Sequence, residues 1–350
     1  MTQKKARDFG IQIGSLPCGP SNSLSDIDGL SFGHVTLSDG AVQTGVSVIH
    51  PVPNSPFENK CAAACHVFNG FGKSVGLMQV EELGQLETPI VLTNTLSVGT
   101  ASSALVRYML AGHEAIGETT GTVNPVVMEC NDGGLSDIRG LHISEQHVLE
   151  VLGMHEKAFE QGAIGAGTGM VCYSLKGGIG SASRQVSYGK RSFTLAAATL
   201  CNMGRLPDLL VGGRAVGAEI EALRKSSLAH EVDKGSIIML VATDAPLSSR
   251  QLKRICVRAG TGLARTGSHF GSGSGDIALA FSTATRLPHE SPDNPVMTVD
   301  VLHESAMDQL FRATVEAVEE AILNALFASR TTRGKKGRIR TSLADWWPKL

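Results

Sequence analysis

The sequence has no excess of charge of either sign. Its 31 lysine and arginine residues nearly balance 33 aspartate and glutamate residues, so the formal net charge is −2, and only 18% of the 350 residues are charged. Such a weak overall field does not favour binding to nucleic acid or to an anionic membrane surface. We therefore expect a small-molecule partner rather than a polyanion.

Long apolar runs are also missing. No run of about 18 apolar residues occurs without interruption, which argues against a helix that spans a membrane. The basic residues near the N-terminus are followed by Gly10, Gly14 and Pro17, so no apolar stretch of the signal-peptide type forms. The seven cysteines are an odd number and have no C-x-x-C spacing, unlike a secreted disulfide framework or a zinc ribbon. These absences predict a cytoplasmic protein.

One group of residues has the types that bind metal ions, namely Cys61, Cys65 and His66. Three alanines, 62–64, separate the two cysteines inside an apolar run. A buried strand or helix explains such a run more simply than a metal site does. We therefore predict no metal site there.

Glycine is abundant, with 40 residues, or about 11% of the chain against a usual share of roughly 7%. Four loops concentrate it: 69–73, 165–169, 176–180 and 267–276. A P-loop or a Rossmann fingerprint requires glycines at fixed spacings, and none of the four loops has them. In the first loop, for example, Val67 stands where a P-loop needs glycine. Nucleotide binding is therefore not predicted.

Short apolar runs alternate with helical patterns, which is typical of an α/β protein. The predicted strands are 46–49, 62–67, 90–93, 123–128, 193–200, 237–242 and 277–281. Ser144 and Ser249 are each predicted to cap a helix. The longest helix is predicted over 300–328, where apolar residues repeat every four positions from Leu302 to Leu326.

The C-terminal segment differs from the rest in composition. Six of the eleven residues from 330 to 340 are basic, and no apolar period runs through them, so we expect a solvated basic tail over 330–350. Trp346 and Trp347 lie outside the basic run. We expect them to dock the C-terminus onto the body of the protein or onto a neighbouring subunit.

The segment Lys234-Gly235-Ser236 lies immediately before the buried strand predicted at 237–242. A strand can hold the serine rigidly, while glycine permits an unusual backbone conformation before it. This arrangement suits a self-cleaving bond, in which the hydroxyl attacks the carbonyl of Gly235 and hydrolysis exposes Ser236 as a new N-terminus. An α-amine, with a reference pKa of about 7.7–8.0, can then take the hydroxyl proton without a histidine.

Six segments of the chain, taken in order, carry a resemblance to a known family. These segments are Asp26–His34, Pro89–Gly99, Gly165–Met170, Lys176–Arg184, Gly235–Pro246 and Gly271–Asp276. They resemble the L-aminopeptidase/D-esterase (DmpA-type) and β-aminopeptidase family, and the likeness covers about residues 23–330.

The resemblance implies an α/β fold with four layers, an αββα sandwich similar to that of N-terminal-nucleophile hydrolases but with different strand connectivity. It also implies a single domain, 1–350, that cuts itself into chains 1–235 and 236–350. No metal ion or organic cofactor is implied. The processed units are expected to form a homo-oligomer, a tetramer or larger.

The resemblance also implies roles for individual residues. Ser236 is the nucleophile, and its α-amine is the general base. Ser274 and Asp276 match the family's pair that positions the serine and shuttles or stabilises its proton. In an extended segment these two positions point to one face, although they could instead only close a loop. Asn202 matches the asparagine whose amide helps to hold the oxyanion.

Two further positions are expected to contact the substrate, and a third would allow a different mechanism. Glu129 matches a carboxylate near the free amino group of the substrate. Asn131 stands where the family commonly has a tyrosine as a second oxyanion donor, so either its amide substitutes for the phenol or the oxyanion hole has another shape. His269 would allow a Ser–His–Asp triad, but self-processing needs no imidazole and we do not favour it.

The leading hypothesis is an autoprocessed serine aminopeptidase that removes N-terminal residues from small peptides, amino-acid amides or esters through an acyl-enzyme on Ser236. The first alternative keeps the fold and is a β-aminopeptidase or an amide-oligomer hydrolase. The second is a non-catalytic scaffold that binds a small molecule. The preference for α- or β-amino acids, and for L or D forms, stays open.

Overall fold

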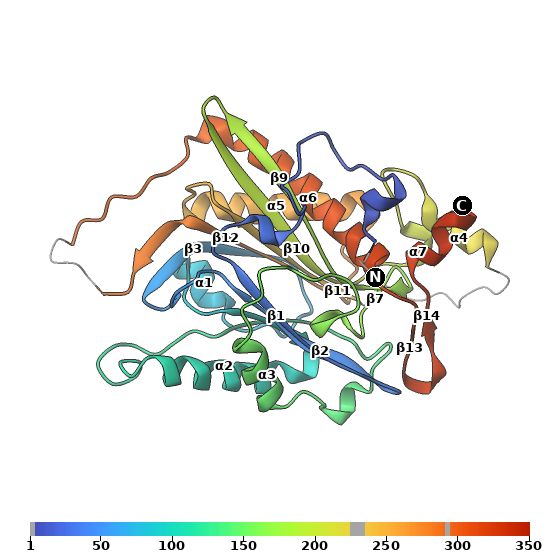
Figure 1. Ribbon diagram of the computed structural model, residues 1–350, viewed down its shortest axis with the longest axis horizontal. Helices are drawn as coiled ribbons and strands as arrows, with labels where there is room; N and C mark the ends of the chain where they lie inside the picture. Colours follow the sequence, from blue (N-terminus) through green and yellow to red (C-terminus); the bar gives the residue numbers. More distant parts are fainter. Residues whose placement is uncertain (1–3, 225–234, 291–294) are drawn as a thin grey trace.

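The computed structural model describes residues 4–224, 235–290 and 295–350, and most of its strands form two large sheets (Figure 1). The first sheet has the order β1-β2-β5-β6, in which β5 and β6 are parallel. Its strands are β1 (Ser31–Asp39), β2 (Val42–His50), β5 (Ile90–Asn94) and β6 (Val126–Cys130).

The second sheet has six strands in the order β4-β3-β12-β11-β10-β9, and within it β11 and β12 are parallel neighbours. Its strands are β3 (Asn59–Gly70), β4 (Gln85–Leu86), β9 (Gly178–Tyr188), β10 (Arg191–Asn202), β11 (Ser236–Thr243) and β12 (Gly275–Pro288). Two short hairpins are separate from it: β7 (Val171–Cys172) with β8 (Leu175–Lys176), and β13 (Thr332–Arg333) with β14 (Ile339–Arg340).

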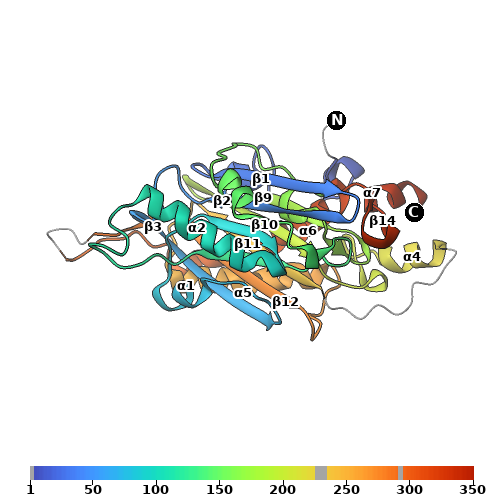
Figure 2. The ribbon, with the colours of Figure 1, turned by 90° about the horizontal axis from the view of Figure 1, so that it is seen from below.

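Helices cover the outer face of each sheet. The six-stranded sheet carries α5 (Ser249–Arg265) and α6 (Met307–Ala328), and the four-stranded sheet carries α2 (Val98–Gly112) and α3 (Glu145–Leu152). Figure 2 shows α2 and α3 in front of the strands that they cover. The remaining helices are α1 (Leu77–Leu83), α4 (Val216–Leu223) and α7 (Leu343–Trp346). No helix in the described part of the chain has the length and apolar character needed to cross a membrane.

The alternation of side chains along β11 shows how the layers are joined. Ile237 and Met239 belong to the core shared with α5 and α6, whereas Ile238 and Leu240 belong to the core between the two sheets. A third core joins the four-stranded sheet to α2 and α3. Because successive side chains of a strand point to opposite faces, a strand that is buried on both faces is continuously apolar. The fold is thus the expected α/β, four-layer αββα sandwich.

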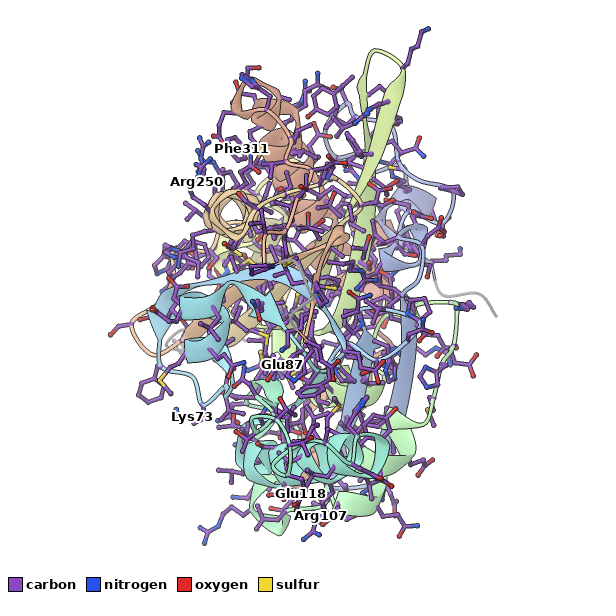
Figure 3. The ribbon with its side chains drawn as sticks, turned by 90° about the vertical axis from the view of Figure 1, so that its left-hand side faces the viewer. Lys73, Glu87, Arg107, Glu118, Arg250 and Phe311 are labelled. Carbon is purple, nitrogen blue, oxygen red and sulfur yellow. The ribbon has the colours of Figure 1, made fainter. Side chains whose placement is uncertain are left out.

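Figure 3 shows the same stacking from the side. Arg250 on α5 and Phe311 on α6 mark one outer layer, and Arg107 on α2 marks the other. Side chains fill the space between these layers.

Most predicted strands lie within observed ones, and the differences have local causes. The strand predicted at 123–128 begins only at Val126, because Pro125 has no amide N–H to donate to a strand ladder. Ser144 caps α3 as predicted, but Ser248 caps α5 instead of Ser249, since its hydroxyl accepts from the amide of Gln251. The long helix α6 begins at Met307, not near residue 300.

Strands β1 and β9 and helix α2 were not expected, because small and polar residues hide their patterns. In β9, Gly178-Ile-Gly-Ser-Ala-Ser packs directly against α6. A Cβ atom on Gly180 would lie 1.9 Å from the carbonyl oxygen of Ala321. Close approach of helix and sheet therefore requires small residues there, and these residues give no strand signal.

The C-terminal segment is folded, so the expected solvated tail over 330–350 is wrong in part. Its basic residues are exposed or half-buried, but the segment forms the β13–β14 hairpin followed by α7. Lys335 binds Asp137 at 3.0 Å. The Trp347 ring lies 5.3 Å from that of Phe327 on α6, which confirms that the C-terminus docks onto the body.

Cys61, Cys65 and His66 lie on β3, as the strand reading predicts. Burial raises the pKa of the Cys61 thiol to about 11 and that of Cys65 to about 12. Among the described residues there is no cluster of three side chains suited to a metal ion.

Candidate active site

Ser236, Asn202 and Asp276 are brought together by the ends of three adjacent strands. Ser236 is the first residue of β11, and its partner in the antiparallel ladder is Asn202, the last residue of β10. On the other side of β11, Ile237 pairs with Asp276 at the start of β12. The Ser236 side chain is buried, and its Oγ accepts a hydrogen bond from the amide of Gly275 at 3.0 Å.

Gly235 lies tightly against the end of β10. A Cβ atom at this position would lie 1.8 Å from the carbonyl oxygen of Asn202 and 2.7 Å from the Cα atom of Met203. Every other residue would therefore clash with backbone. The φ angle of Gly235 depends on Lys234, which lies outside the described residues, so the unusual conformation expected at Gly235 stays a prediction.

Ser274 and Asp276 contact each other through their side chains. The Ser274 hydroxyl donates to Asp276 Oδ2, and Asn69 Nδ2 donates to Ser274 Oγ at 3.1 Å. Asn69 also binds the carbonyl oxygen of Gly271 at 2.7 Å and pairs with Asp276 across β3 and β12. The backbone of Ser274 closes the loop as well, since its carbonyl accepts from Phe71. Ser274 therefore does both things that the sequence allowed: its backbone closes the loop, and its hydroxyl binds the carboxylate of Asp276.

Asn202 has one end of its amide already engaged. Its Oδ1 accepts a hydrogen bond from the amide of Val171 at 2.9 Å, and the residue is 7% exposed. The group that Asn202 can offer to a substrate is therefore its Nδ2 donor. This is the chemistry that an oxyanion requires.

Glu129 lies near the end of β6 with its carboxylate buried. Oε1 accepts from the amide of Lys73 at 2.8 Å, and Oε2 accepts from the hydroxyl of Thr95. A Cβ atom on Gly72 would lie 3.6 Å from both Glu129 Oε1 and the Cα atom of Gly275. The carboxylate therefore lies close to the residue whose amide binds Ser236.

Asn131 and His269 are placed differently from the residues above. Asn131 is exposed, and its Oδ1 accepts from the amide of Gly133 at 2.9 Å, so one end of the amide is used in a local turn. Its role as a second oxyanion donor stays a prediction. His269 is exposed on its loop, whereas Ser236 and Asp276 are buried, and this placement does not favour a triad.

Three residues that bind the site residues were not expected from the sequence, namely Asn69, Thr95 and Val171. Asn69 and Thr95 lie in segments that the sequence singled out, 69–73 and 89–99, but for other reasons. Val171 contributes only a backbone amide, which carries no sequence signal. Long-range pairing of strands, rather than any local pattern, brings these groups to the site.

Comparison with known proteins identifies the family of this chain. Residues 22–340 match the model for peptidase family S58. The chain belongs to peptidase family S58. It is therefore a hydrolase that acts on peptide bonds, and the reading as a non-catalytic scaffold is wrong.

Three relatives show how far the likeness extends. A β-peptidyl aminopeptidase, BapA, from Sphingosinicella xenopeptidilytica is 36% identical, over 94% of this S58 chain and 86% of its own. The crystal structure of the PH0078 protein from Pyrococcus horikoshii OT3 is 46% identical with a TM-score of 0.93, covering 99% of this chain and 98% of that one.

The third relative is the L-aminopeptidase D-Ala-esterase/amidase from Ochrobactrum anthropi. It is 34% identical with a TM-score of 0.89, covering 97% of this chain and 95% of that one. That structure is described as a prototype for the serine aminopeptidases and as a new variant among the Ntn hydrolase fold. The fold class expected from the sequence is thus confirmed.

Proposed function

We propose that this S58 enzyme is a serine aminopeptidase that cuts its own chain between Gly235 and Ser236. In the cut, the hydroxyl oxygen of Ser236 bonds to the carbonyl carbon of Gly235 while the peptide C–N bond breaks and the nitrogen takes a proton. Water then hydrolyses the ester. Gly235 is left with a carboxylate, and Ser236 is left with a free α-amine and a free hydroxyl.

In turnover the same hydroxyl attacks the carbonyl carbon of the substrate. The α-amine of Ser236 takes the hydroxyl proton and then delivers a proton to the leaving amine, and water hydrolyses the acyl-enzyme. The Nδ2 of Asn202 stabilises the negative oxygen of the tetrahedral intermediate. The Ser274 and Asp276 pair holds the strand end beside Ser236 and stabilises the proton as it moves.

The burial of the Glu129 carboxylate is the observation that carries the aminopeptidase reading. The residue is 3% exposed, and the groups that bind its carboxylate in the described part of the chain, the Lys73 amide and the Thr95 hydroxyl, are both neutral. A buried carboxylate without a cation is costly. The ammonium group of a peptide's N-terminus supplies that cation next to the nucleophile.

A substrate pair tests this reading. We expect an amino-acid p-nitroanilide with a free amine to be hydrolysed at least about 100-fold faster than its N-acetylated form, because only the former can pair with Glu129. The variant Glu129→Gln keeps the shape and should reduce this preference about tenfold or more. Equal rates on the two substrates would contradict the proposed binding of the amine.

A β-aminopeptidase is the second candidate, favoured by the relative of 36% identity that is named a β-peptidyl aminopeptidase. The two candidates share the site and differ in the distance between the ammonium group and the attacked carbonyl. Comparison of kcat/KM for the p-nitroanilides of alanine and of β-alanine distinguishes them. The preferred substrate identifies the class.

A further inference from the structure

The hairpin formed by β7 and β8 contacts Asn202 and the residue that follows it. The Val171 amide binds Asn202 Oδ1, and the Tyr173 amide donates to the carbonyl oxygen of Met203 at 2.7 Å. The position of the hairpin therefore determines which way the Asn202 amide faces.

Lys176, the last residue of β8, lies inside this hairpin and the loop before it. Its side chain is fully buried. Nζ donates to three carbonyl oxygens, those of Gly167 at 3.1 Å, Met170 at 3.0 Å and Gly177 at 2.6 Å. An ammonium group has three N–H donors and no acceptor, so these three carbonyls use all of its donors. Two of the three acceptors lie in the segment that leads directly to Val171.

Burial and two neighbouring acidic groups act in opposite directions on the Lys176 amine. Burial lowers the pKa of Lys176 to about 7, while nearby Cys172 and Asp132 act in the opposite direction. Asp132 is itself fully buried, and burial raises its pKa to about 7. Each of the three carbonyls also accepts from one other group, namely the Met170 amide, the Gly177 amide and the Ser329 hydroxyl. Removing the amine would therefore take one of two donors from each buried carbonyl and remove the group that ties all three together.

The turn of the hairpin is constrained from a second side. Its central residues, Tyr173 and Ser174, both have left-handed backbones, with φ of 50° and 57°. The buried Tyr173 hydroxyl lies 2.8 Å from Thr266 Oγ1, and Gly204 must lack a side chain because a Cβ atom would lie 2.4 Å from the tyrosine ring. Such conformations persist only where the surroundings fix them.

We infer that Lys176 is a positioning residue of the active site, which fixes the loop 167–171 so that the Val171 amide holds Asn202 with its Nδ2 facing the substrate. This inference rests on the proposed function, in which Asn202 donates to the oxyanion. Lys176 itself contacts neither substrate nor nucleophile. Its effect must therefore pass through Asn202.

A double-mutant cycle tests this dependence. We would measure kcat and KM of the full-length gene product for wild type, Lys176→Met, Asn202→Ala and the double variant, per mole of titrated active sites. Loss of an oxyanion donor costs about 10²–10³ in kcat. We expect Lys176→Met to lower kcat at least about tenfold with KM within about threefold, and to have less than about a threefold effect when Asn202 is already alanine. Lys176→Arg, which keeps the charge and the donors, should restore part of kcat.

Asn324→Ala is the matched control. Asn324 is also fully buried and binds two backbone groups, the Ala6 amide and the Ser181 carbonyl, but it lies on α6. The Asn324→Ala variant should have a lower melting temperature and an unchanged kcat.

For a variant that matures too slowly to give kcat, the first-order rate of chain cleavage replaces kcat in the same cycle. If Lys176→Met does not fold, Val171→Pro removes the same amide donor and should give the same loss of kcat.

The possible failures are distinct. A wild-type kcat for Asn202→Ala would overturn the role of Asn202 in the proposed function. If Asn202→Ala lowers kcat strongly and Lys176→Met lowers kcat by the same factor with or without Asn202, the two effects are independent. That result would overturn the positioning role of Lys176 and leave the proposed function intact. A wild-type kcat for Lys176→Met, or for Val171→Pro where that variant replaces it, would also overturn the positioning role.

Discussion

Two groups of buried polar side chains lie at the six-stranded sheet, and they differ in how their charges are balanced. The outer cluster comprises the buried Arg184, Glu316 and Glu320, between β9 and α6, together with Arg7, an exposed residue of the N-terminal segment. Arg184 binds Glu320 at 2.6 Å and Glu316 at 3.1 Å, and Arg7 binds Glu320 at 2.6 Å. Each of these two carboxylates therefore meets a guanidinium group.

The inner cluster comprises Ser236, Ser274, Asp276, Asn202 and Glu129. Its polar groups are bound mainly by hydroxyls and backbone amides, and within the described residues the Glu129 carboxylate is bound by two neutral groups. Burial of polar groups is common to both clusters and so does not distinguish a catalytic site from a structural one. The difference is that, in the proposed function, the inner cluster offers a carboxylate, an amide donor and a hydroxyl nucleophile to a substrate.

The largest effect that tests this difference concerns Arg184→Met. This change leaves two buried carboxylates without their shared cation, and we expect a loss of about 3–5 kcal/mol in the free energy of unfolding. The kcat of the folded enzyme should not change. Urea unfolding measures the loss of stability, and kcat is measured at urea concentrations below the unfolding transition.

The control is Arg107→Met, which removes an exposed ion pair with Glu145 and should cost less than about 1 kcal/mol. A large loss of kcat in folded Arg184→Met would contradict the separation of the clusters.

Ser274→Ala should show the opposite pattern. The change removes the hydroxyl that binds Asp276, so we expect kcat to fall about 10²–10³-fold, while the melting temperature changes by only a few degrees. Ser272→Ala is the matched control, since Ser272 is an exposed residue of the same glycine-rich loop. A Ser274→Ala enzyme with normal kcat would show that this serine only closes the loop.

The smallest effect is a dependence of stability on pH. Burial opposes the ionisation of Glu320, but the hydrogen bond from Arg7 and the charge of Arg184 outweigh it and hold its pKa below the ordinary value. The unfolded chain therefore binds more protons in acid. This contribution to stability is present above the ordinary glutamate pKa of about 4.3 and is lost as pH falls through the lower, folded-state pKa.

Urea unfolding at several pH values between about 7 and 3 measures this dependence. Glu320→Gln should be less stable than wild type at neutral pH, and its free energy of unfolding should fall less steeply in acid. An equally steep fall in both proteins would assign the acid sensitivity to other carboxylates.

The sequence predicted the strands that form the layers of the fold better than it predicted the side-chain contacts between segments. Continuous apolar runs such as 237–242 identified strands buried on both faces, because burial on both sides leaves no polar alternation. The motif segments 26–34 and 176–184 instead contribute structural contacts: Ser183 donates to Asp26 at 2.5 Å, and Arg184 belongs to the outer cluster. Resemblance alone could not distinguish these residues from catalytic ones.

The candidate site was predicted in its residue types but not in its geometry. Ser236 faces Asn202 because of the register between β10 and β11, and register depends on how whole strands pair. The roles of Asn69 and of the Val171 amide depend on segments far away in the chain. No local pattern in the sequence contains that information.

The identity of the nucleophile is tested most directly by peptide mapping of the active enzyme after treatment with a sulfonyl fluoride, which sulfonylates a nucleophilic hydroxyl and releases fluoride. We predict loss of activity with one adduct per active site, on the hydroxyl of a peptide that begins at Ser236 and has a free α-amine. Chains of 235 and 115 residues, roughly 25 and 12 kDa, should be present before treatment. An active enzyme with an intact Gly235–Ser236 bond, or an inactivating adduct on any other residue, would contradict the proposal.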